Sequence, residues 1–259
     1  MITPQKSGRL QSRTAAISGS SRGIGLAVAR AFLAEGARVA VNSRDAAVAD
    51  RVAEELGEGA VGVAADVSTE AGARALVGGA IEAFGHLDVL INNAGMSAAV
   101  PTLELDLQRW QTVVDLNMTS VFLCSREAAR HMLEKGGGSI INTASILSFS
   151  SFPRRLAYGA TKAAVVQMTR IMAAEWAPTI RVNAVAPGYV RTEMTEQLQA
   201  QGKINFDAIE RRTPLRRVSR PDEMAGAFVF LASDEASFVT GETIVVDGGW
   251  LSFGAFEGV

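Results

Sequence analysis

The segment from Ser18 to Gly25 constrains the fold of this chain more than any other. It is rich in glycine and lies between an apolar, strand-like stretch (residues 14–17) and a helix-like stretch (residues 26–35). Glycine tolerates positive φ angles, lets a ligand approach the backbone closely and lets a helix pack tightly on a strand. The free N–H groups at the start of the helix then face an anion. This arrangement is typical of a turn that holds the diphosphate of a dinucleotide.

The spacing of these glycines differs from that of the commonest dinucleotide-binding motif. Gly19, Gly23 and Gly25 read G-x-x-x-G-x-G and not the commonest dinucleotide fingerprint, G-x-G-x-x-G, so a different family is indicated. The motif alone is weak, because a glycine-rich turn between a strand and a helix can also lack a ligand. More specific residues are therefore needed.

Two ionisable side chains far along the chain give a more specific indication of function. Tyr158 and Lys162 are four residues apart in a helix-like segment, so their side chains are neighbours on one face. An ammonium near a phenol favours the phenolate, and the pKa of Tyr158 is expected to fall toward the range of a working general acid. The alternative is a surface pair on an amphipathic helix.

Further polar residues follow predicted strands. Ser145 ends an apolar strand at 139–144 and precedes Tyr158 by 13 residues. Residues 92–95, Asn-Asn-Ala-Gly, end another strand, Asn117 lies farther along, and Pro187 and Gly188 follow a strand at 180–186. Together with the glycine turn, this set resembles the short-chain dehydrogenase/reductase family from about residue 13 to residue 250. The chain departs from the family at Ser18, where threonine is usual, but the hydroxyl is kept.

The resemblance implies hydride transfer between a nicotinamide cofactor and an alcohol or ketone. It makes Tyr158 the general acid and base, and Ser145 the donor that orients the substrate oxygen. Lys162 would lower the pKa of Tyr158 and hold the nicotinamide ribose. Asn117 would hold a water molecule that relays protons to Lys162.

Cofactor contacts are implied at the glycine turn and at the ends of the strands. The diphosphate, adenine, ribose and carboxamide groups would meet Gly19, Ser21, Arg22, Gly23, Ile24, Gly25, Ser43, Arg44, Asp66, Val67, Asn93, Ala94, Gly95, Tyr158, Lys162, Pro187, Gly188, Val190 and Thr192. Thr192 can also cap a helix that starts at Glu193, and the two roles are compatible.

The end of the second predicted strand bears on the choice of cofactor. Relatives that prefer NAD carry an aspartate there, whereas this chain has Ser43 followed by Arg44. Arg44, together with Arg22, can bind a 2′-phosphate through charge-assisted hydrogen bonds. The expected cofactor is NADP(H), with NAD(H) as the alternative.

Composition limits the other classes of function. The chain has 25 basic and 27 acidic residues and no long basic run, which argues against nucleic acid or a membrane as partner. It has no apolar leader and no apolar stretch long enough to span a bilayer, so a cytoplasmic protein is expected. Cys124 is the only cysteine, His86 and His131 are interpreted as structural or surface residues, and no metal site is predicted.

Strands and helices alternate along the sequence. Strands are predicted at 14–18, 38–42, 60–65, 87–92, 139–144, 180–186 and 243–247, and helices at 23–35, 45–56, 69–84, 103–134 (broken), 156–176 and 221–232. The expected fold is a single α/β domain over residues 1–259, Rossmann-type and doubly wound, with a seven-stranded parallel sheet and helices on both faces. Residues 1–12 would form an N-terminal extension. Residues 193–218 would form a substrate lid by analogy with the family, or a surface segment that packs on a neighbouring subunit.

Several functions stay open at this point. The first is an NADPH-dependent carbonyl reductase acting on a small secondary alcohol or ketone. A 3-oxoacyl-acyl-carrier-protein reductase is the second, although Gly136, Pro178 and Thr179 occupy places where such enzymes carry basic docking residues, with Lys135 and Arg181 close by. An NAD-dependent sugar or polyol dehydrogenase is less favoured. A non-catalytic NADPH-binding regulator is least favoured, because such a protein need not keep all four catalytic residues. The resemblance also implies a homotetramer.

The segment from Phe149 to Leu156 is expected to line the substrate pocket between Ser145 and Tyr158. Phe149 and Phe152 would form an apolar wall. Arg154 and Arg155 can meet an acidic substrate or lie in a solvated loop, and the solvated loop is the favoured interpretation.

Overall fold

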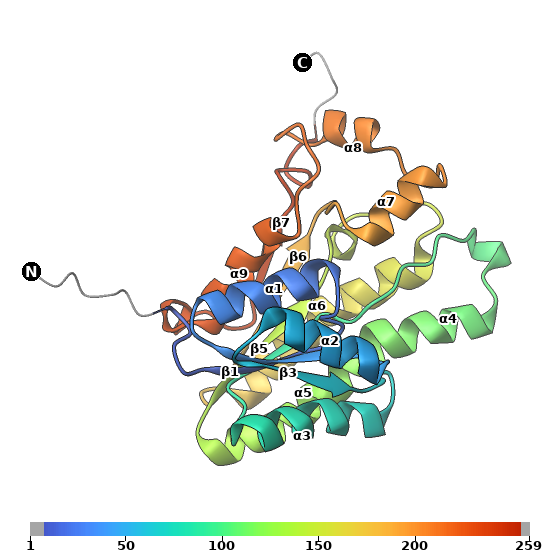
Figure 1. Cartoon of the computed structure of the whole chain (residues 1–259). Coiled ribbons are helices and arrows are strands. Elements are labelled where there is room, and N and C mark those ends of the chain that lie inside the picture. Colours follow the sequence, from blue (N-terminus) through green and yellow to red (C-terminus); the bar gives the residue numbers. More distant parts are fainter. Residues whose placement is uncertain (1–7, 255–259) are drawn as a thin grey trace, which may run out of the picture.

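A parallel sheet of seven strands forms the centre of the computed structural model, which describes residues 8–254 (Figure 1). The strand order is β3-β2-β1-β4-β5-β6-β7. The strands are β1 (Thr14–Ile17), β2 (Arg38–Ser43), β3 (Ala60–Ala64), β4 (Val89–Asn92), β5 (Gly138–Thr143), β6 (Ile180–Pro187) and β7 (Thr243–Val246). This order, with its reversal between β1 and β4, confirms the predicted Rossmann-type, doubly wound fold.

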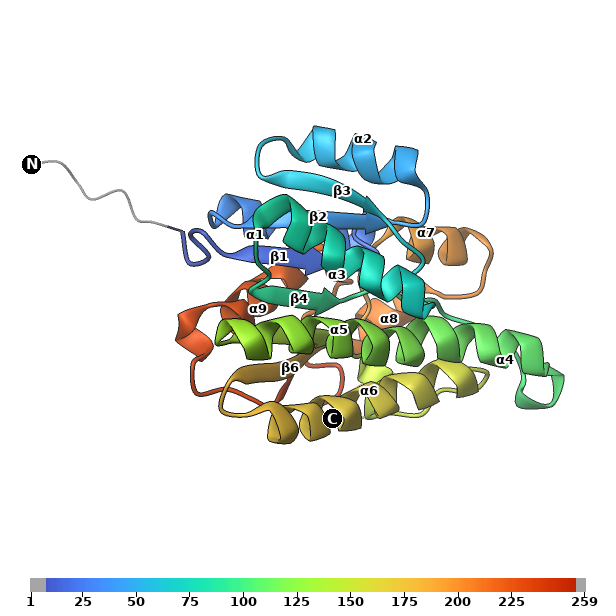
Figure 2. The same cartoon turned by 90° about the horizontal axis from the view of Figure 1, so that it is seen from below.

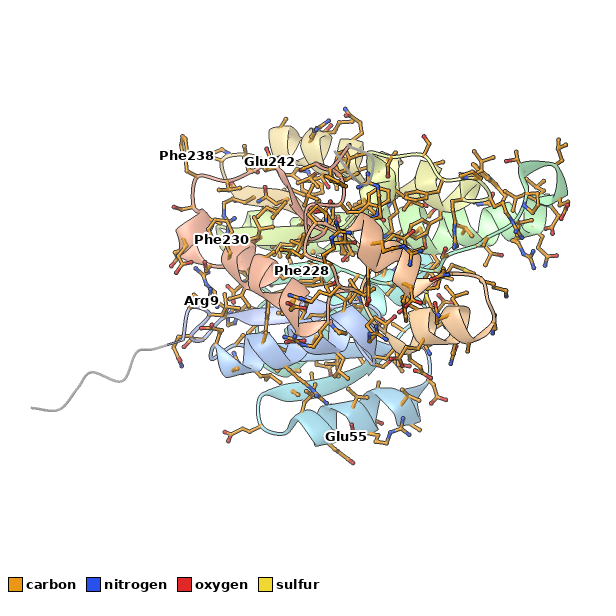
Figure 3. The ribbon with its side chains drawn as sticks, turned by 90° about the horizontal axis from the view of Figure 1, so that it is seen from above. Arg9, Glu55, Phe228, Phe230, Phe238 and Glu242 are labelled. Atoms are coloured by element: carbon orange, nitrogen blue, oxygen red, sulfur yellow. The ribbon has the colours of Figure 1, made fainter. Side chains whose placement is uncertain are left out.

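Helices cover both faces of the sheet. One face carries α1 (Gly23–Ala34), α2 (Ala46–Leu56) and α9 (Asp222–Ala232), and Figure 3 labels Phe228 and Phe230 on α9. The other face carries α3 (Glu70–Phe84), α5 (Ser120–Lys135) and α6 (Leu156–Trp176), which lie in front of the sheet in Figure 2. Two hydrophobic clusters, one on each face, hold these layers together.

The strands are rich in apolar residues because both faces of the sheet are covered by helices. In β4, Leu90 packs into the cluster under α3, α5 and α6, and Ile91 packs into the cluster under α1 and α9. Successive side chains point to opposite faces, so the central strands contribute to both cores. Asp45 and Thr69 cap the starts of α2 and α3 by accepting backbone N–H groups.

The predicted broken helix at 103–134 is divided into four pieces. A 3₁₀ turn (Thr102–Glu104) is followed by α4 (Leu107–Val114), a π-helical turn (Asp115–Thr119) and α5. Short 3₁₀ turns also occur at Ile146–Ser148 and Asp234–Ala236. The π-helical turn contains Asn117, one of the candidate catalytic residues.

Two helices interrupt the alternation after β6. They are α7 (Glu193–Ala200) and α8 (Phe206–Arg212), and both lie near the top of the view in Figure 1. A small apolar cluster of Phe206, Ile209 and Val218 holds α8, with Tyr189 and Ile204 packed against it. The segment predicted as a lid is therefore helical and has a core of its own.

The predicted N-terminal extension is described from Gly8 onward, and residues 1–7 lie outside the described residues. Leu10 is fully buried, and its N–H donates to the carbonyl oxygen of Glu35 at 3.0 Å. Residues 8–12 thus pack on the end of α1. Within residues 8–254, no helix is long and apolar enough to cross a membrane.

Candidate active site

The glycine turn is fastened to the ends of β2 and β4. The N–H of Gly19 donates to Oδ1 of Asn42 at 2.9 Å, and the N–H of Asn42 donates to Oγ of Ser20 at 2.8 Å. Gly19 has a φ of 60°, and a Cβ on it would lie 2.9 Å from the Cα of Ala94. A side chain at Gly19 would therefore be strained and would displace the chain after β4.

Gly25 brings the start of α1 close to the turn. A Cβ on it would lie 2.5 Å from Nδ2 of Asn93 and 2.7 Å from the carbonyl oxygen of Gly19. Gly25 thus lets α1 pack on the turn and on Asn93. The amide of Asn93 donates to the carbonyl oxygens of Ser18 and Gly19, both at 3.0 Å, and so ties the turn to β4.

Ser18, the departure from the family pattern, uses its hydroxyl in the same fastening. Its Oγ accepts from the N–H groups of Asn93 at 2.9 Å and Ala94 at 3.0 Å. A hydroxyl is all that these contacts require, so serine in place of threonine preserves them.

One large cavity lies at the carboxyl ends of the strands. Its volume is about 810 Å³. Of the predicted site residues, it is lined by Gly19, Ser21, Arg22, Gly23, Ile24, Ser43, Arg44, Asp66, Val67, Asn93, Ala94, Gly95, Ser145, Tyr158, Lys162, Pro187, Gly188, Val190 and Thr192. Gly25 and Asn117 do not line it. The register explains the convergence: Ile17 pairs with Val41 and Ile91, so the residues that follow these strands emerge at one edge.

Ser145 is held near the carboxyl end of β5 by the 3₁₀ turn that follows it. Its Oγ accepts from the N–H of Leu147 at 3.2 Å, and its own N–H donates to Oγ of Ser148 at 3.3 Å. The Ser148 hydroxyl donates in turn to the carbonyl oxygen of Lys162 at 2.8 Å. These bonds tie the Ser145 turn to α6, the helix that carries Tyr158 and Lys162.

The pKa of Tyr158 on α6 shifts in the opposite direction from the expected one. Burial raises the pKa of Tyr158, while a hydrogen bond with Ser145 and the charge of Arg155 lower it. Lys162 Nζ donates to the carbonyl oxygen of Thr143 at 2.6 Å and lies 5.9 Å from the centre of the Tyr158 ring. The expected lowering of the Tyr158 pKa by Lys162 is therefore wrong for this structure, because the ammonium is turned toward the end of β5.

Asn117 is fully buried behind the cavity wall. Its Oδ1 accepts from the N–H of Met96 at 2.8 Å, and its Nδ2 donates to the Met96 carbonyl oxygen at 2.9 Å. A Cβ placed on Gly95 would lie 3.3 Å from Asn117 Oδ1 and 3.7 Å from Lys162 Nζ. Asn117 and Lys162 therefore both lie close to Gly95, and the proton relay implied by the family resemblance stays a prediction.

Thr192 caps α7, as the second of its two expected roles requires. Its Oγ1 accepts from the N–H of Thr195 at 3.3 Å, and the Thr195 hydroxyl accepts from the N–H of Thr192 at 2.8 Å. Glu193, the first residue of α7, lies 3.9 Å from Arg22 of the glycine turn. The start of α7 thus faces the turn across the cavity.

Sequence reasoning missed several residues of the cavity wall. They include Asn42, Arg51, Met96, Ser97, Leu147, Tyr189, Met194, Leu198 and Ile204. Position at the end of a strand could have indicated Asn42, and position after a strand Ser97 and Tyr189, whereas no local signal singles out the residues from α2 and α7.

Only one of the two phenylalanines expected to form an apolar wall lines the cavity. Phe152 lines the cavity and stacks on Trp250, with ring centres 5.2 Å apart. Phe149 is 47% exposed and does not line the cavity. The 3₁₀ turn at Ile146–Ser148 directs the chain outward at Phe149, so this prediction is wrong.

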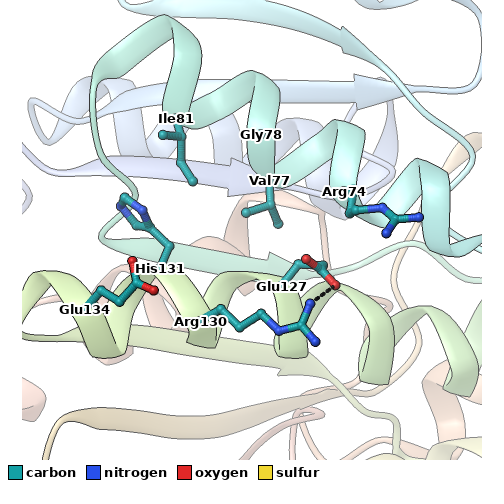
Figure 4. Close-up of a pocket in the computed structure, with 8 residues that line it drawn as sticks. All are labelled: Arg74, Val77, Gly78, Ile81, Glu127, Arg130, His131 and Glu134. Carbon is teal, nitrogen blue, oxygen red and sulfur yellow. Dashed lines mark hydrogen bonds and ion pairs between the residues drawn. The ribbon is translucent and has the colours of Figure 1, made fainter.

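A second cavity, of about 350 Å³, lies between α3 and α5 (Figure 4). Its charged side chains pair locally: Arg130 donates to Glu127 at 3.0 Å. His131 Nε2 accepts the N–H of Leu87 at 3.2 Å, which is a structural role. Burial raises the pKa of Cys124 to about 12, so its thiol is not reactive. No group of three or more His, Cys, Asp or Glu within residues 8–254 is placed to hold a metal ion.

Burial of Lys162 has a consequence for stability. Its pKa falls from 10.5 to about 8, so between these values the unfolded chain holds a proton that the folded chain has lost. The cost that the buried Lys162 charge imposes on the folded state is present in full below pH 8, and it disappears as the pH rises toward 10.5. We expect Lys162→Met to raise the free energy of unfolding by about 1–3 kcal/mol near neutral pH, and by less at high pH. Urea unfolding of wild type and Lys162→Met without cofactor, near neutral pH and at high pH, measures the change in the free energy of unfolding.

Lys135→Met is the matched control for that experiment, because Lys135 is exposed at the end of α5. It should change stability little at either pH. A Lys162→Met protein that is less stable at both pH values would contradict the burial penalty.

Comparison with known proteins agrees with this geometry. A family model described as enoyl-(acyl carrier protein) reductase matches residues 19–251. The chain is 39% identical over 250 residues to the 3-oxoacyl-(acyl-carrier-protein) reductase of Synechocystis sp., covering 94% of this chain and 99% of the relative. It is 42% identical over 248 residues to galactitol 2-dehydrogenase (L-tagatose-forming) of Cereibacter sphaeroides, covering 93% and 96%. A gluconate 5-dehydrogenase from Burkholderia cenocepacia, solved in complex with NADP and tartrate, has a TM-score of 0.90 at 37% identity, covering 95% and 97%. The chain therefore belongs to the short-chain dehydrogenase/reductase family and is an oxidoreductase of alcohol and ketone groups.

Proposed function

We propose that this protein is an NADP(H)-dependent reductase that interconverts a ketone and a secondary alcohol, with Tyr158 as the general acid and base. The observation that carries the proposal is the convergence of Ser145, Tyr158 and Lys162 with the glycine turn in one cavity. A nucleotide needs the turn, and carbonyl chemistry needs the hydroxyl groups and the lysine. Either set alone would support a much weaker conclusion.

The cavity fits a dinucleotide. Gly19 leaves no room for a Cβ, so the backbone at the turn stays bare and its N–H groups can meet a diphosphate. Asp66 and Val67 would border the adenine, and Val190 and Thr192 would hold the carboxamide. When bound, the nicotinamide supplies or accepts the hydride. The protein must then supply the proton and the donors for the substrate oxygen.

Tyr158 would provide that proton. Burial raises its pKa, so the phenol is protonated at neutral pH and can donate to the ketone oxygen during reduction. The Ser145 hydroxyl would donate to the same oxygen, where charge develops in the transition state. Asn117 Oδ1 and Lys162 Nζ both lie close to Gly95, and a water held by Asn117 would relay protons to Lys162 and so to Tyr158. Lys162 would also bind the nicotinamide ribose.

The preference for NADP(H) rests on charge at the end of β2. Arg44 and Arg22 both line the cavity, and Ser43 stands where a repelling aspartate would otherwise be. The Burkholderia gluconate 5-dehydrogenase was solved with NADP bound, which is consistent with this preference. NAD(H) is the alternative cofactor.

A 3-oxoacyl-acyl-carrier-protein reductase is the second candidate, favoured by the Synechocystis relative. It would need a basic surface for the acidic carrier near the cavity. Gly136 and Thr179 offer no charge at the expected places, so we rank this function below a small-molecule reductase. The galactitol relative makes a polyol a further possible substrate class.

We also propose that residues 193–218 act as the substrate lid and that the protein is a homotetramer. Met194 and Leu198 of α7 line the cavity from the lid side, which supports the first proposal. Large apolar side chains are exposed on α4, α5 and α6 and near β7, among them Leu107, Phe122 and Ile171. Contacts between subunits would bury these side chains, which supports the second.

A substrate screen tests the proposed function. Purified protein is mixed with NADPH or NADH and with simple ketones, keto acids, ketoses or 3-oxoacyl thioesters, and the loss of reduced-cofactor absorbance is followed. We expect reduction of a small ketone with NADPH. Turnover of 3-oxoacyl thioesters alone would favour the carrier-protein reductase, and binding of NADPH without turnover of any ketone would contradict the proposal.

A further inference from the structure

Arg155 places an unneutralised positive charge inside the cavity. It immediately precedes α6, its side chain is half-buried, and its Nη1 donates to Oγ of Ser97 at 2.7 Å. Within the described part of the chain, no carboxylate lies within ion-pair distance of it. A guanidinium that is partly removed from water without an anion is unfavourable, so a bound anion would stabilise it. The favoured interpretation of Arg155 as a solvated loop residue is therefore wrong.

The acidic residues of the cavity are engaged elsewhere. Asp45 caps α2, Asp66 accepts from Ser68, and Glu193 faces Arg22. None of them compensates Arg155. Arg154, by contrast, is exposed and does not line the cavity.

The charge of Arg155 reaches the reacting end of the cavity. It lowers the pKa values of Tyr158 and Tyr189, against the larger effect of burial, which raises both. Arg155 is the N-cap of α6 and Tyr158 lies in the first turn of that helix, and both side chains line the cavity. An anion held by Arg155 would thus share the cavity with the substrate oxygen that meets Tyr158.

Lys162 is the other cationic side chain at this end of the cavity, and its Nζ is engaged by the carbonyl oxygen of Thr143. The remaining side chains are apolar or uncharged. Phe152 and Leu147 line this end, and Tyr189 lies with its ring 6.4 Å from that of Trp250. The ligand that fits is a short molecule with an apolar body and one anionic end.

We propose that the natural substrate carries a carboxylate, and that Arg155, held by Ser97, binds this carboxylate while Tyr158 and Ser145 meet the ketone or alcohol oxygen. The inference rests on the proposed function and names the substrate class for the same site. A planar guanidinium can form two parallel hydrogen bonds with a carboxylate, which fixes orientation as well as affinity. Arg155 is then a specificity residue.

Matched pairs of ligands test this proposal. The short keto acids 4-oxopentanoate and 5-oxohexanoate differ from their methyl esters mainly in charge. Two readouts are used: kcat/KM for reduction in the presence of NADPH, and calorimetric binding of the same keto acids and esters in the presence of NADP⁺, with which a ketone cannot exchange hydride. We expect wild type to favour acid over ester, and Arg155→Gln to lower this preference about 10- to 150-fold in both readouts.

Arg154→Gln is the matched control, because it removes the same charge from the neighbouring exposed position and should keep the preference for the acid. Arg155→Lys should retain part of it, since the charge stays but the paired hydrogen bonds are lost.

The outcomes separate this inference from the proposed function. Equal affinity of wild type for acid and ester, no detectable binding of the acids, or an equal loss for both ligands in Arg155→Gln would overturn the role of Arg155. If the wild type still reduces ketones with NADPH, any of these three results leaves the proposed function intact. Arg155-dependent binding of acids without any turnover would support the carboxylate site and overturn only the proposed function.

Discussion

Tyr158→Phe is expected to lower kcat by at least about 10²–10⁴-fold and to leave the affinity for NADPH nearly unchanged. The phenol would act on the substrate oxygen, and its loss removes the proton donor while the ring keeps its place on α6. The Ser145 hydroxyl would remain, held by the turn that follows β5. Steady-state kinetics and titration with NADPH measure the two effects separately.

Tyr189→Phe is the matched control, since the chain has only two tyrosines and both line the cavity. This second variant should lose far less activity, because Tyr189 lies outside the Ser145 turn and α6. Turnover in Tyr158→Phe close to that of wild type would mean that another group donates the proton. A large loss of NADPH affinity would instead indicate a structural role for Tyr158.

Arg44→Ala is expected to weaken NADPH binding about 10- to 150-fold and to change NADH binding little, because a charge-assisted hydrogen bond contributes about 1.5–3 kcal/mol. The side chain of Arg44 lines the cavity and has no acidic partner within residues 8–254. Adding Ser43→Asp should go further, since the new carboxylate repels the 2′-phosphate and accepts the ribose hydroxyls of NADH. The measurement is kcat/KM with both cofactors for wild type, the single variants and the double variant.

Arg51→Ala gives the comparison that this experiment needs. Arg51 also lines the cavity, but it lies on α2 and 3.8 Å from Glu55. A selective loss of NADPH in Arg51→Ala and not in Arg44→Ala would move the phosphate contact to α2. A wild type that prefers NADH, or an equal loss for both cofactors in Arg44→Ala, would contradict the assignment to Arg44.

Most of the fold was predictable because its signals are local. Each of the seven strands contains a short apolar run, and the parallel arrangement follows from the helices between them. The candidate site was predictable to nearly the same extent. Residues that follow parallel strands must emerge at one edge, so Ser18, Asn93 and Ser145 come together wherever such a sheet forms.

The departures concern the directions of side chains. Lys162 is on the predicted face of α6, yet its ammonium donates to Thr143 on β5 and does not lower the pKa of Tyr158. Phe149 turns outward, and Arg155 turns inward to Ser97. These three outcomes depend on packing between elements far apart in the sequence, which no spacing rule contains.

The sequence by itself determined the order of strands and helices, the glycine turn and the positions of the four candidate catalytic residues along the chain, because apolar periodicity and backbone preference act over a few residues. Only the tertiary structure decided which charges lack partners. Asp66 and Glu193 find partners in Ser68 and Arg22, whereas the Arg155 guanidinium, among residues 8–254, finds the hydroxyl of Ser97, 58 residues away in the chain, and no carboxylate. The electrostatic balance of a cavity is a sum over all the elements around it, and that sum exists only once the chain has folded.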